Sequence, residues 1–274
     1  MLSHGTTPCV LAGIDGSQSG LDAALWVIDE TIELGVPLRL VNVIEATDTP
    51  GADPTEQARR MAAAEVAVHS ALAAVEATER PVTVEVEILQ GRPVQALLEA
   101  ARSAMMVCVG ARGLKHATQG RIGSTAAALS ASARSPVVIV RTRRPQSGSS
   151  RAVVIEIDDT AKGGTVLQRG LDAAKRLGAP VRVLTPARLH ADVQAQWDRR
   201  LAEWHRRYSD LDIVSVSNQG AGLDYIAAHA ESIQLLVVGR ERRDGVGPLV
   251  GAPGNAALRD TDCSIMVCEP HNAL

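Results

Sequence analysis

The stretch VCVGARGLKHATQGRIGST, residues 107–125, brings together residue types that bind anions. It holds four glycines, two arginines, a lysine and a histidine, directly after an apolar run that predicts a strand. It ends in Gly123, Ser124 and Thr125 at the expected start of a helix, where free N–H groups and the helix dipole favour a phosphate. Connections of about a dozen residues without regular structure are uncommon in compact domains and often functional. The stretch therefore predicts a phosphate-binding loop, although glycine patterns also occur in surface loops that bind nothing.

Two familiar phosphate-binding motifs do not fit this chain. The pattern GxxxxGK followed by Ser or Thr is absent, and the first apolar run leads into Gly13-Ile14-Asp15-Gly16-Ser17 instead of GxGxxG. A carboxylate at Asp15 would repel a phosphate, but it suits a ribose hydroxyl or an adenine amino group. A role in a turn or a helix cap is the simpler alternative for Asp15.

The elements around these residues predict a doubly wound α/β domain. Apolar runs over 9–14, 38–44, 82–88, 105–110 and 136–140 alternate with segments of helical periodicity. Buried strands separated by helices pair in parallel through right-handed crossovers. Sheets of this kind bind ligands at the carboxyl ends of their strands. Both Asp15 and the glycine-rich loop follow such an end, which favours a binding role for both.

The second half of the chain repeats the first. Residues 153–184 align with 10–41 at a constant offset of 143, so that Asp158 corresponds to Asp15. Later in each half a pair of glycines lies 19 residues apart, at Gly91 and Gly110 and again at Gly220 and Gly239. This predicts two tandem domains, residues 1–143 and 151–274, joined by a polar linker over 144–150.

The composition excludes several classes of partner. The chain has 274 residues, 46% of them apolar and 2% aromatic, and a net charge of −3. Such a chain suits neither nucleic acid nor an acidic membrane surface. The first residues lack a signal-peptide pattern, and no apolar run reaches the roughly 18 residues that span a bilayer. We therefore predict a cytoplasmic protein that binds neither nucleic acid nor membranes.

The spacing Gly110-x2-Gly113-x9-Gly123-Ser124 resembles the nucleotide-binding signature of universal stress proteins. Asp15 stands where that family has an aspartate after its first strand. The segments VPLRLVNVI, GRPVQALLEAA and RSPVVIVR are also similar to the family. The resemblance covers almost the whole chain as a tandem pair, like the two-domain members common in actinobacteria.

This resemblance implies a five-stranded parallel sheet of order 3-2-1-4-5 in each domain, and ATP, with or without Mg²⁺, as the ligand. It places Asp15 at the ribose, the backbone of Val43 at the adenine and the glycine-rich loop at the phosphates. The nucleotide-binding residues that it implies are Gly13, Ile14, Asp15, Val43, Val109, Gly110, Arg112, Gly113, Gly123, Ser124 and Thr125. It also implies that the fifth strands, PVVIV and SIMVC, pair in an intramolecular pseudo-dimer or a homodimer.

The second copy departs from the signature and is predicted to be degenerate. It keeps Asp158, Gly239 and Gly251, but Arg242 replaces Gly113, and Ala252 and Pro253 replace Ser124 and Thr125. Pro186 corresponds to Val43 and lacks the backbone N–H that adenine would need. We therefore expect no ATP in the second domain. Arg240, Arg242 and Arg243 are expected to form a solvated basic loop, with binding of another anion as the alternative.

No catalytic or metal-binding residues are predicted. The seven histidines form no recognisable nucleophile motif, HExxH is absent, and the four cysteines have neither a CxxC pair nor zinc spacing. The expected function is a nucleotide-dependent regulator in the stress response, not an enzyme, with slow ATP hydrolysis left open. The alternative is a nucleotide-independent scaffold for an unknown protein partner.

Overall fold

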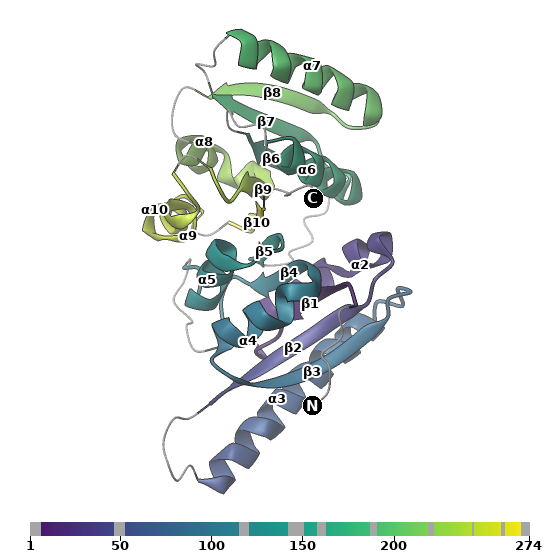
Figure 1. Ribbon diagram of the computed structural model, residues 1–274, viewed down its shortest axis with the longest axis vertical. Coiled ribbons are helices and arrows are strands. Elements are labelled where there is room, and N and C mark those ends of the chain that lie inside the picture. The colour runs from purple at the N-terminus through teal and green to yellow at the C-terminus, as the bar shows by residue number, and fades with distance from the viewer. Residues whose placement is uncertain are drawn as a thin grey trace. The chain divides into compact units, whose positions relative to one another are not determined.

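The computed structural model describes residues 7–46, 53–114, 121–141, 151–157, 163–186, 191–218, 222–242, 244–258 and 261–269. The chain divides into two compact units, Met1–Arg143 and Arg144–Leu274 (Figure 1). Each unit is an α/β structure with its own sheet and its own core.

The first unit has a five-stranded parallel sheet. Its strands are β1 (Cys9–Gly13), β2 (Leu38–Glu45), β3 (Val84–Gly91), β4 (Ala104–Gly110) and β5 (Val137–Val140). They lie in the order β3-β2-β1-β4-β5, and every neighbouring pair is parallel. This confirms the predicted fold class and strand order. Because β1 ends opposite Val41 while β2 continues to Glu45, the last residues of β2 extend past the end of β1.

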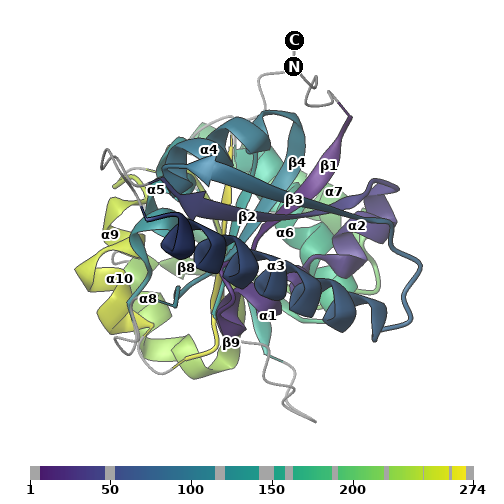
Figure 2. The same cartoon turned by 90° about the horizontal axis from the view of Figure 1, so that it is seen from below.

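Helices cover both faces of this sheet. They are α1 (Gln18–Trp26), α2 (Ile28–Leu34), α3 (Pro54–Glu76), α4 (Pro93–Ala100), the 3₁₀ turn η1 (Ala101–Ser103) and α5 (Ser124–Ser132). α1 packs beside α3 and α4 beside α5, and the two pairs lie on opposite sides of the sheet (Figure 2). Leu11, Leu40, Met106 and Ile139 fill the core between them and are fully buried.

The local sequence explains where these elements begin and end. Ser17 caps α1 by accepting a hydrogen bond from Gly20 N, and Gly35 ends α2 in the left-handed conformation with φ of 64°. The periodicity of residues 21–32 predicts a single helix, but the structure interrupts it at Val27. The edge strand β3 begins at Val84, two residues later than predicted, and runs on to Gly91 because β2 gives it a partner as far as Glu45.

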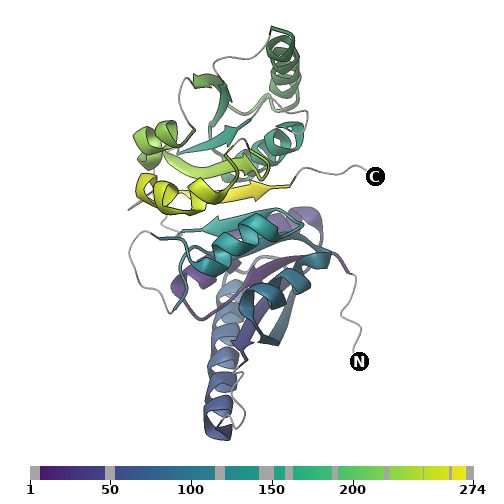
Figure 3. The same cartoon turned by 60° about the vertical axis from the view of Figure 1, so that its left-hand side comes forward.

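The second unit repeats this architecture (Figure 3). Its strands are β6 (Ala152–Glu156), β7 (Val181–Pro186), β8 (Ile213–Asn218), β9 (Ile233–Gly239) and β10 (Ser264–Cys268), in the order β8-β7-β6-β9-β10. Its helices are α6 (Gly163–Leu177), α7 (Ala191–Arg207), α8 (Gly222–His229), the 3₁₀ turn η2 (Ala230–Ser232), α9 (Gly247–Val250) and α10 (Ala252–Ala257).

The offset of 143 between the two halves holds at the level of single hydrogen bonds. Ile14 N donates to Val41 O at 2.8 Å in the first unit, and Ile157 N donates to Leu184 O at 3.1 Å in the second. The ends of β1 and β6 therefore occupy equivalent positions in the two units. Of the helices in the ranges described above, none is both long and apolar enough to cross a membrane.

Candidate nucleotide-binding site

The sequence-predicted residues of the first unit meet at the carboxyl edge of its sheet. Gly13, Ile14 and Asp15 follow one another at the end of β1, and Val109 and Gly110 end the neighbouring strand β4. Val43 lies near the end of β2, on the other side of β1. This is the edge at which doubly wound sheets bind their ligands.

Asp15 links the end of β1 to the glycine-rich loop. Its Oδ1 accepts hydrogen bonds from Ser17 N at 3.0 Å and from Ser17 Oγ at 2.6 Å. Its Oδ2 accepts a hydrogen bond from Leu114 N, also at 3.0 Å. The side chain is exposed. Asp15 is therefore a turn-capping carboxylate, as the simpler alternative proposed, but it also fixes a residue 99 positions away.

Glycine is required where the loop approaches the start of α1. A Cβ at Gly110 would lie 2.5 Å from the carbonyl carbon of Ser19 and 2.7 Å from Gly20 N. A Cβ at Gly113 would lie 2.8 Å from Asp15 Oδ2. Real Cβ atoms are essentially never found at such distances. Both glycines of the spacing Gly110-x2-Gly113 are thus explained by close approach, not by positive φ.

The C-terminal end of the glycine-rich loop lies beside its N-terminal end. Gly123 N donates to Ala111 O at 2.8 Å, which joins the two ends of the loop. Gly123 is the N-cap residue of α5, and as a glycine it has no side chain to cap the helix. The first backbone N–H groups of α5, from Ser124 onward, have no partner within the helix. Arg112 is half-buried and Arg121 exposed, while Lys115 and His116 lie outside the described residues.

Val43 lies in the part of β2 that extends past the end of β1. Val41 O points toward β1, where it accepts from Ile14 N. Backbone groups two residues further along a strand face the same side. The N–H and C=O of Val43 therefore face the side on which β1 has ended. The buried amide of Asn42 donates to Ile14 O at 2.7 Å and holds the end of β1 against β2 there.

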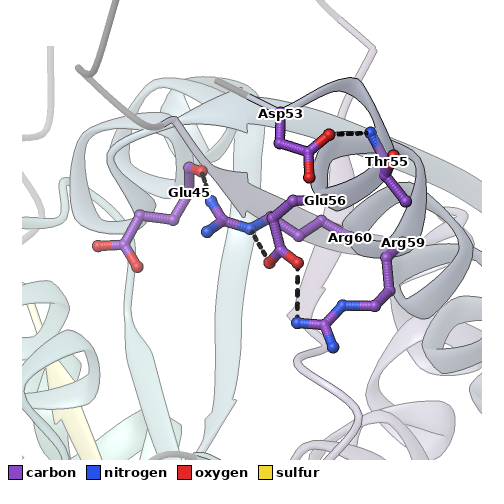
Figure 4. A network of polar contacts seen from close by, with 6 residues as sticks. All are labelled: Glu45, Asp53, Thr55, Glu56, Arg59 and Arg60. Atoms are coloured by element: carbon purple, nitrogen blue, oxygen red, sulfur yellow. Dashed lines mark hydrogen bonds and ion pairs between the residues drawn. The ribbon is translucent and has the colours of Figure 1, made fainter. Parts of the chain in front are cut away.

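Sequence reasoning missed a polar network where α3 meets the end of β2 (Figure 4). Arg60 donates from Nε to Glu56 Oε1 at 2.9 Å and from Nη1 to Glu45 O at 3.4 Å. Arg59 Nη2 lies 2.8 Å from the other oxygen of Glu56. The hydrogen bonds from Arg60 and Arg59 lower the pKa of the Glu56 carboxyl. Arg59 and Arg60 follow Glu56 by three and four residues, and this spacing predicts ion pairs on a helix.

The corresponding edge of the second unit is occupied by an ion pair. Arg242 Nη2 lies 2.8 Å from Glu156 Oε1 and 3.0 Å from Glu156 Oε2. Arg242 Nε lies 3.2 Å from Oε1 as well, and Nη1 donates to Gly245 O at 3.3 Å. The Arg242 side chain is only 5% exposed. By the offsets of the repeat, Glu156 stands at the position of Gly13 and Arg242 at that of Gly113.

The expectation of a solvated basic loop is therefore wrong for two of its three arginines. Arg242 is buried against Glu156, and Arg240 forms an ion pair with Glu269. Each guanidinium pairs with a carboxylate that is distant in the sequence, so its charge is compensated within the chain. Arg243 lies outside the described residues.

Four other positions of the second unit correspond to predicted site residues of the first unit. Pro186 is the last residue of β7, paired with Asn218 of β8, at the place that Val43 holds in β2. Gly239 ends β9, and a Cβ there would meet only a Val166 methyl group at 3.3 Å. Gly251 is the N-cap residue of the short helix α10. Asp158 lies outside the described residues.

Comparison with known proteins identifies the family. The model of the Universal stress protein family matches residues 9–141, which lie in the first unit. Universal stress protein Rv2028c of Mycobacterium tuberculosis is 43% identical over 266 residues, 95% of each chain. The chain belongs to the universal stress protein family. Universal stress protein Rv2624c of the same organism is 34% identical over 265 residues, 96% of each chain.

A solved universal stress protein shares the fold. The crystal structure of a universal stress protein from Archaeoglobus fulgidus covers 99% of each chain with a TM-score of 0.73 at 15% identity. In the part of this universal stress protein that the structure describes, no group of three or more His, Cys, Asp or Glu side chains is placed to hold a metal ion.

Proposed function

We propose that this universal stress protein binds ATP at the carboxyl edge of its first unit and acts in the cytoplasm as a nucleotide-dependent regulator of the stress response. One observation carries the proposal. A carboxylate, a strand end that extends past its neighbour and a helix N-terminus converge at one sheet edge, as Asp15, Val43 and Ser124. These three groups match the chemistry of a ribose, a base and a phosphate.

Each part of the site suits one part of the nucleotide. A carboxylate oxygen accepts more than one hydrogen bond, so Asp15 Oδ2 can accept from a ribose hydroxyl as well as from Leu114 N. The backbone of Val43 offers a donor and an acceptor to the edge of adenine. The N–H groups that begin α5, together with its dipole, favour the phosphates, and the Arg112 guanidinium lies in the same loop. A magnesium ion would accompany the phosphates.

The geometry at Asp15 favours binding over catalysis. Both carboxylate oxygens already accept hydrogen bonds, from Ser17 and from Leu114. A carboxylate held in this way is suited to fixed recognition of a hydroxyl group. A regulator needs its nucleotide-bound and nucleotide-free states to bind a partner with different affinities. This difference requires no proton transfer at the site.

The second unit is proposed to bind no ATP. The Arg242–Glu156 pair introduces two side chains at positions where the first unit has only glycine. Pro186 has no N–H to offer a base at the position of Val43. Pro253 removes a further donor from the start of α10, where the first unit has Thr125. These substitutions affect the positions proposed for ribose, base and phosphates alike.

Titration calorimetry on a matched pair of variants tests the proposed location. Among the described residues, a Cβ at Gly123 would approach Ala111 O alone, at 3.6 Å, an ordinary contact, so Gly123→Glu and Gly123→Gln should both fold. Glutamate places a negative charge at the phosphate position, whereas glutamine adds the same bulk without charge. We expect nucleotide-free wild type to bind ATP, Gly123→Gln to bind it more weakly, and Gly123→Glu to show no measurable heat.

Two results would contradict the proposal. If Gly123→Glu binds ATP as well as Gly123→Gln does, the phosphates do not lie at the start of α5. If the wild type binds no adenine nucleotide, the chain is better explained as a nucleotide-independent scaffold that keeps the form of the loop.

A further inference from the structure

We propose that Asp15 is also a positioning residue for the phosphate loop, because it couples recognition of the sugar to recognition of the phosphates through the backbone N–H of Leu114. This inference rests on the proposed function of the first unit and adds a second role for the same carboxylate. The observation behind it is the hydrogen bond from Leu114 N to Asp15 Oδ2, at 3.0 Å.

The carboxylate is held rigidly enough to position another segment. Ser17 donates to Asp15 Oδ1 from both its backbone N and its hydroxyl, at 3.0 and 2.6 Å. The Ser17 hydroxyl in turn accepts the capping bond from Gly20 N at 3.1 Å. Asp15 is thus fixed to the first turn of α1, and the oxygen that faces the loop has a defined place.

The loop is fastened to this turn at more than one point. Arg112 N donates to Ser19 Oγ at 3.4 Å, and the Ser17 hydroxyl lies 3.2 Å from Arg112 O as an alternative acceptor for its proton. Gly113 lacks the Cβ that would lie 2.8 Å from Asp15 Oδ2. Residues 112–114 therefore lie directly on the turn, and Leu114 is the last described residue before the middle of the loop.

Only a carboxylate can make this arrangement. Both Asp15 oxygens accept hydrogen bonds from backbone N–H groups, one from Ser17 and one from Leu114. Asparagine has one carbonyl oxygen and one NH₂ group, so either orientation directs a donor at one of these N–H groups. A ribose hydroxyl needs only one acceptor and could use asparagine. The requirement for two acceptors comes from the loop.

The consequence is a difference between ligands with and without phosphates. If Asp15 holds the loop through Leu114 N, removal of that N–H should weaken binding of ATP and leave binding of adenosine unchanged. Adenosine makes the ribose and base contacts but does not use the loop. A residue with a purely structural role would affect both ligands equally.

The test compares Leu114→Pro with Leu114→Ala in the full chain. Proline removes the N–H, while alanine keeps it, and both remove the same exposed side chain. Leu114 does not have positive φ, and its preceding residue is a glycine, which has no Cβ to clash with a following proline ring. Thermal unfolding of both variants would first show that each is folded. We expect Leu114→Pro to bind ATP about tenfold more weakly than Leu114→Ala, the effect of one hydrogen bond. Adenosine should bind to both variants equally.

Hydrogen exchange gives a second readout that needs no nucleotide. The Leu114 amide should exchange faster in Asp15→Ala, which keeps no acceptor for it, than in the wild type, while the amides of β1 and β4 keep their protection. Equal ATP affinity of Leu114→Pro and Leu114→Ala would overturn the coupling while leaving ATP binding intact. Unchanged exchange of Leu114 in Asp15→Ala would overturn it as well. A wild type that binds neither ATP nor adenosine would instead overturn the proposed function, and this inference with it.

Discussion

Arg242 and Glu156 form a bidentate ion pair in the second unit. Arg242 Nη2 lies 2.8 Å from Glu156 Oε1 and 3.0 Å from Glu156 Oε2. The same two positions in the first unit are Gly113 and Gly13. One copy of the repeat therefore has no side chain at these two positions of its sheet edge, and the other has an ion pair there. This pair is one reason why we propose that the second unit binds no nucleotide.

The first prediction concerns the stability that this pair confers. Arg242→Met leaves the Glu156 carboxylate without its partner in a largely buried place. We expect the free energy of unfolding of the second unit to fall by about 3 kcal/mol. This is the low end of the range for a broken buried ion pair, because the Glu156 side chain is 19% exposed. Urea unfolding in a Trp26→Phe background would measure it, since Trp197 and Trp204 then report on the second unit alone.

The double variant Arg242→Met with Glu156→Leu is the control for this prediction. Replacement of both partners by apolar residues leaves no charge unpaired, so most of the lost stability should return. Equal destabilisation by the single and double variants would show that the ion pair is not the cause.

The second prediction concerns the close approach at the end of β4. Gly110→Ala places a Cβ within 2.7 Å of the backbone of both Ser19 and Gly20, and a backbone cannot move aside as a side chain can. We expect a loss of about 1–3 kcal/mol in the free energy of unfolding, as for overpacked sites, together with weaker ATP binding. Thermal unfolding and calorimetry would measure the two effects.

Gly239→Ala is the matched control at the equivalent position. Among the described residues, its Cβ would approach a Val166 methyl group alone, at 3.3 Å, and a side chain can move aside. The cost should therefore be less than about 1 kcal/mol, and ATP binding should not change. Indistinguishable effects of the two substitutions would contradict the role given to Gly110.

The third prediction concerns the cysteines, all four of which are buried. Burial raises the pKa of the Cys108 thiol well above its usual value, and Cys108 Sγ also donates to Ala23 O at 3.3 Å. Burial likewise raises the pKa of Cys9. Because the thiolate is the reactive form, we expect a thiol reagent to modify none of the four in the native protein and all four in urea.

The same pKa shifts fix the sign of the stability change at high pH. The folded state keeps its Cys9 and Cys108 protons more tightly than the unfolded state. Their contribution is complete below the unfolded thiol pKa of about 8.5 and is lost as the pH rises above it. Stability should therefore decline less steeply on the alkaline side in Cys9→Ala with Cys108→Ala. An identical alkaline profile would contradict this assignment.

The sequence was sufficient for the fold because its signals are local and repeated. Apolar runs, turn residues and the internal repeat predict both sheets. Ser17 and Gly35, which lie at helix ends, are residue types that commonly begin and end helices. The interruption at Val27 was not predictable, because apolar residues continue at helical spacing on both sides of it.

The site was only partly predictable for a different reason. Gly13 and Gly110 end strands and Asp15 follows one, as the apolar runs of the sequence indicate. The bond between Asp15 and Leu114 depends on how two connections meet in space. Three arginines within four residues indicate a solvated loop unless a carboxylate is known to face them. Glu156 lies 86 residues before Arg242, so only the structure reveals that they are partners.

The number of ATP molecules bound per chain tests the central claim most directly. Equilibrium dialysis of radiolabelled ATP against nucleotide-free full-length protein would count them at saturation. One molecule per chain is the predicted result, with none bound to Gly123→Glu. Two molecules per chain would show that neither Pro186 nor the Arg242–Glu156 pair prevents binding in the second unit, and none would contradict the assignment of ATP to the first.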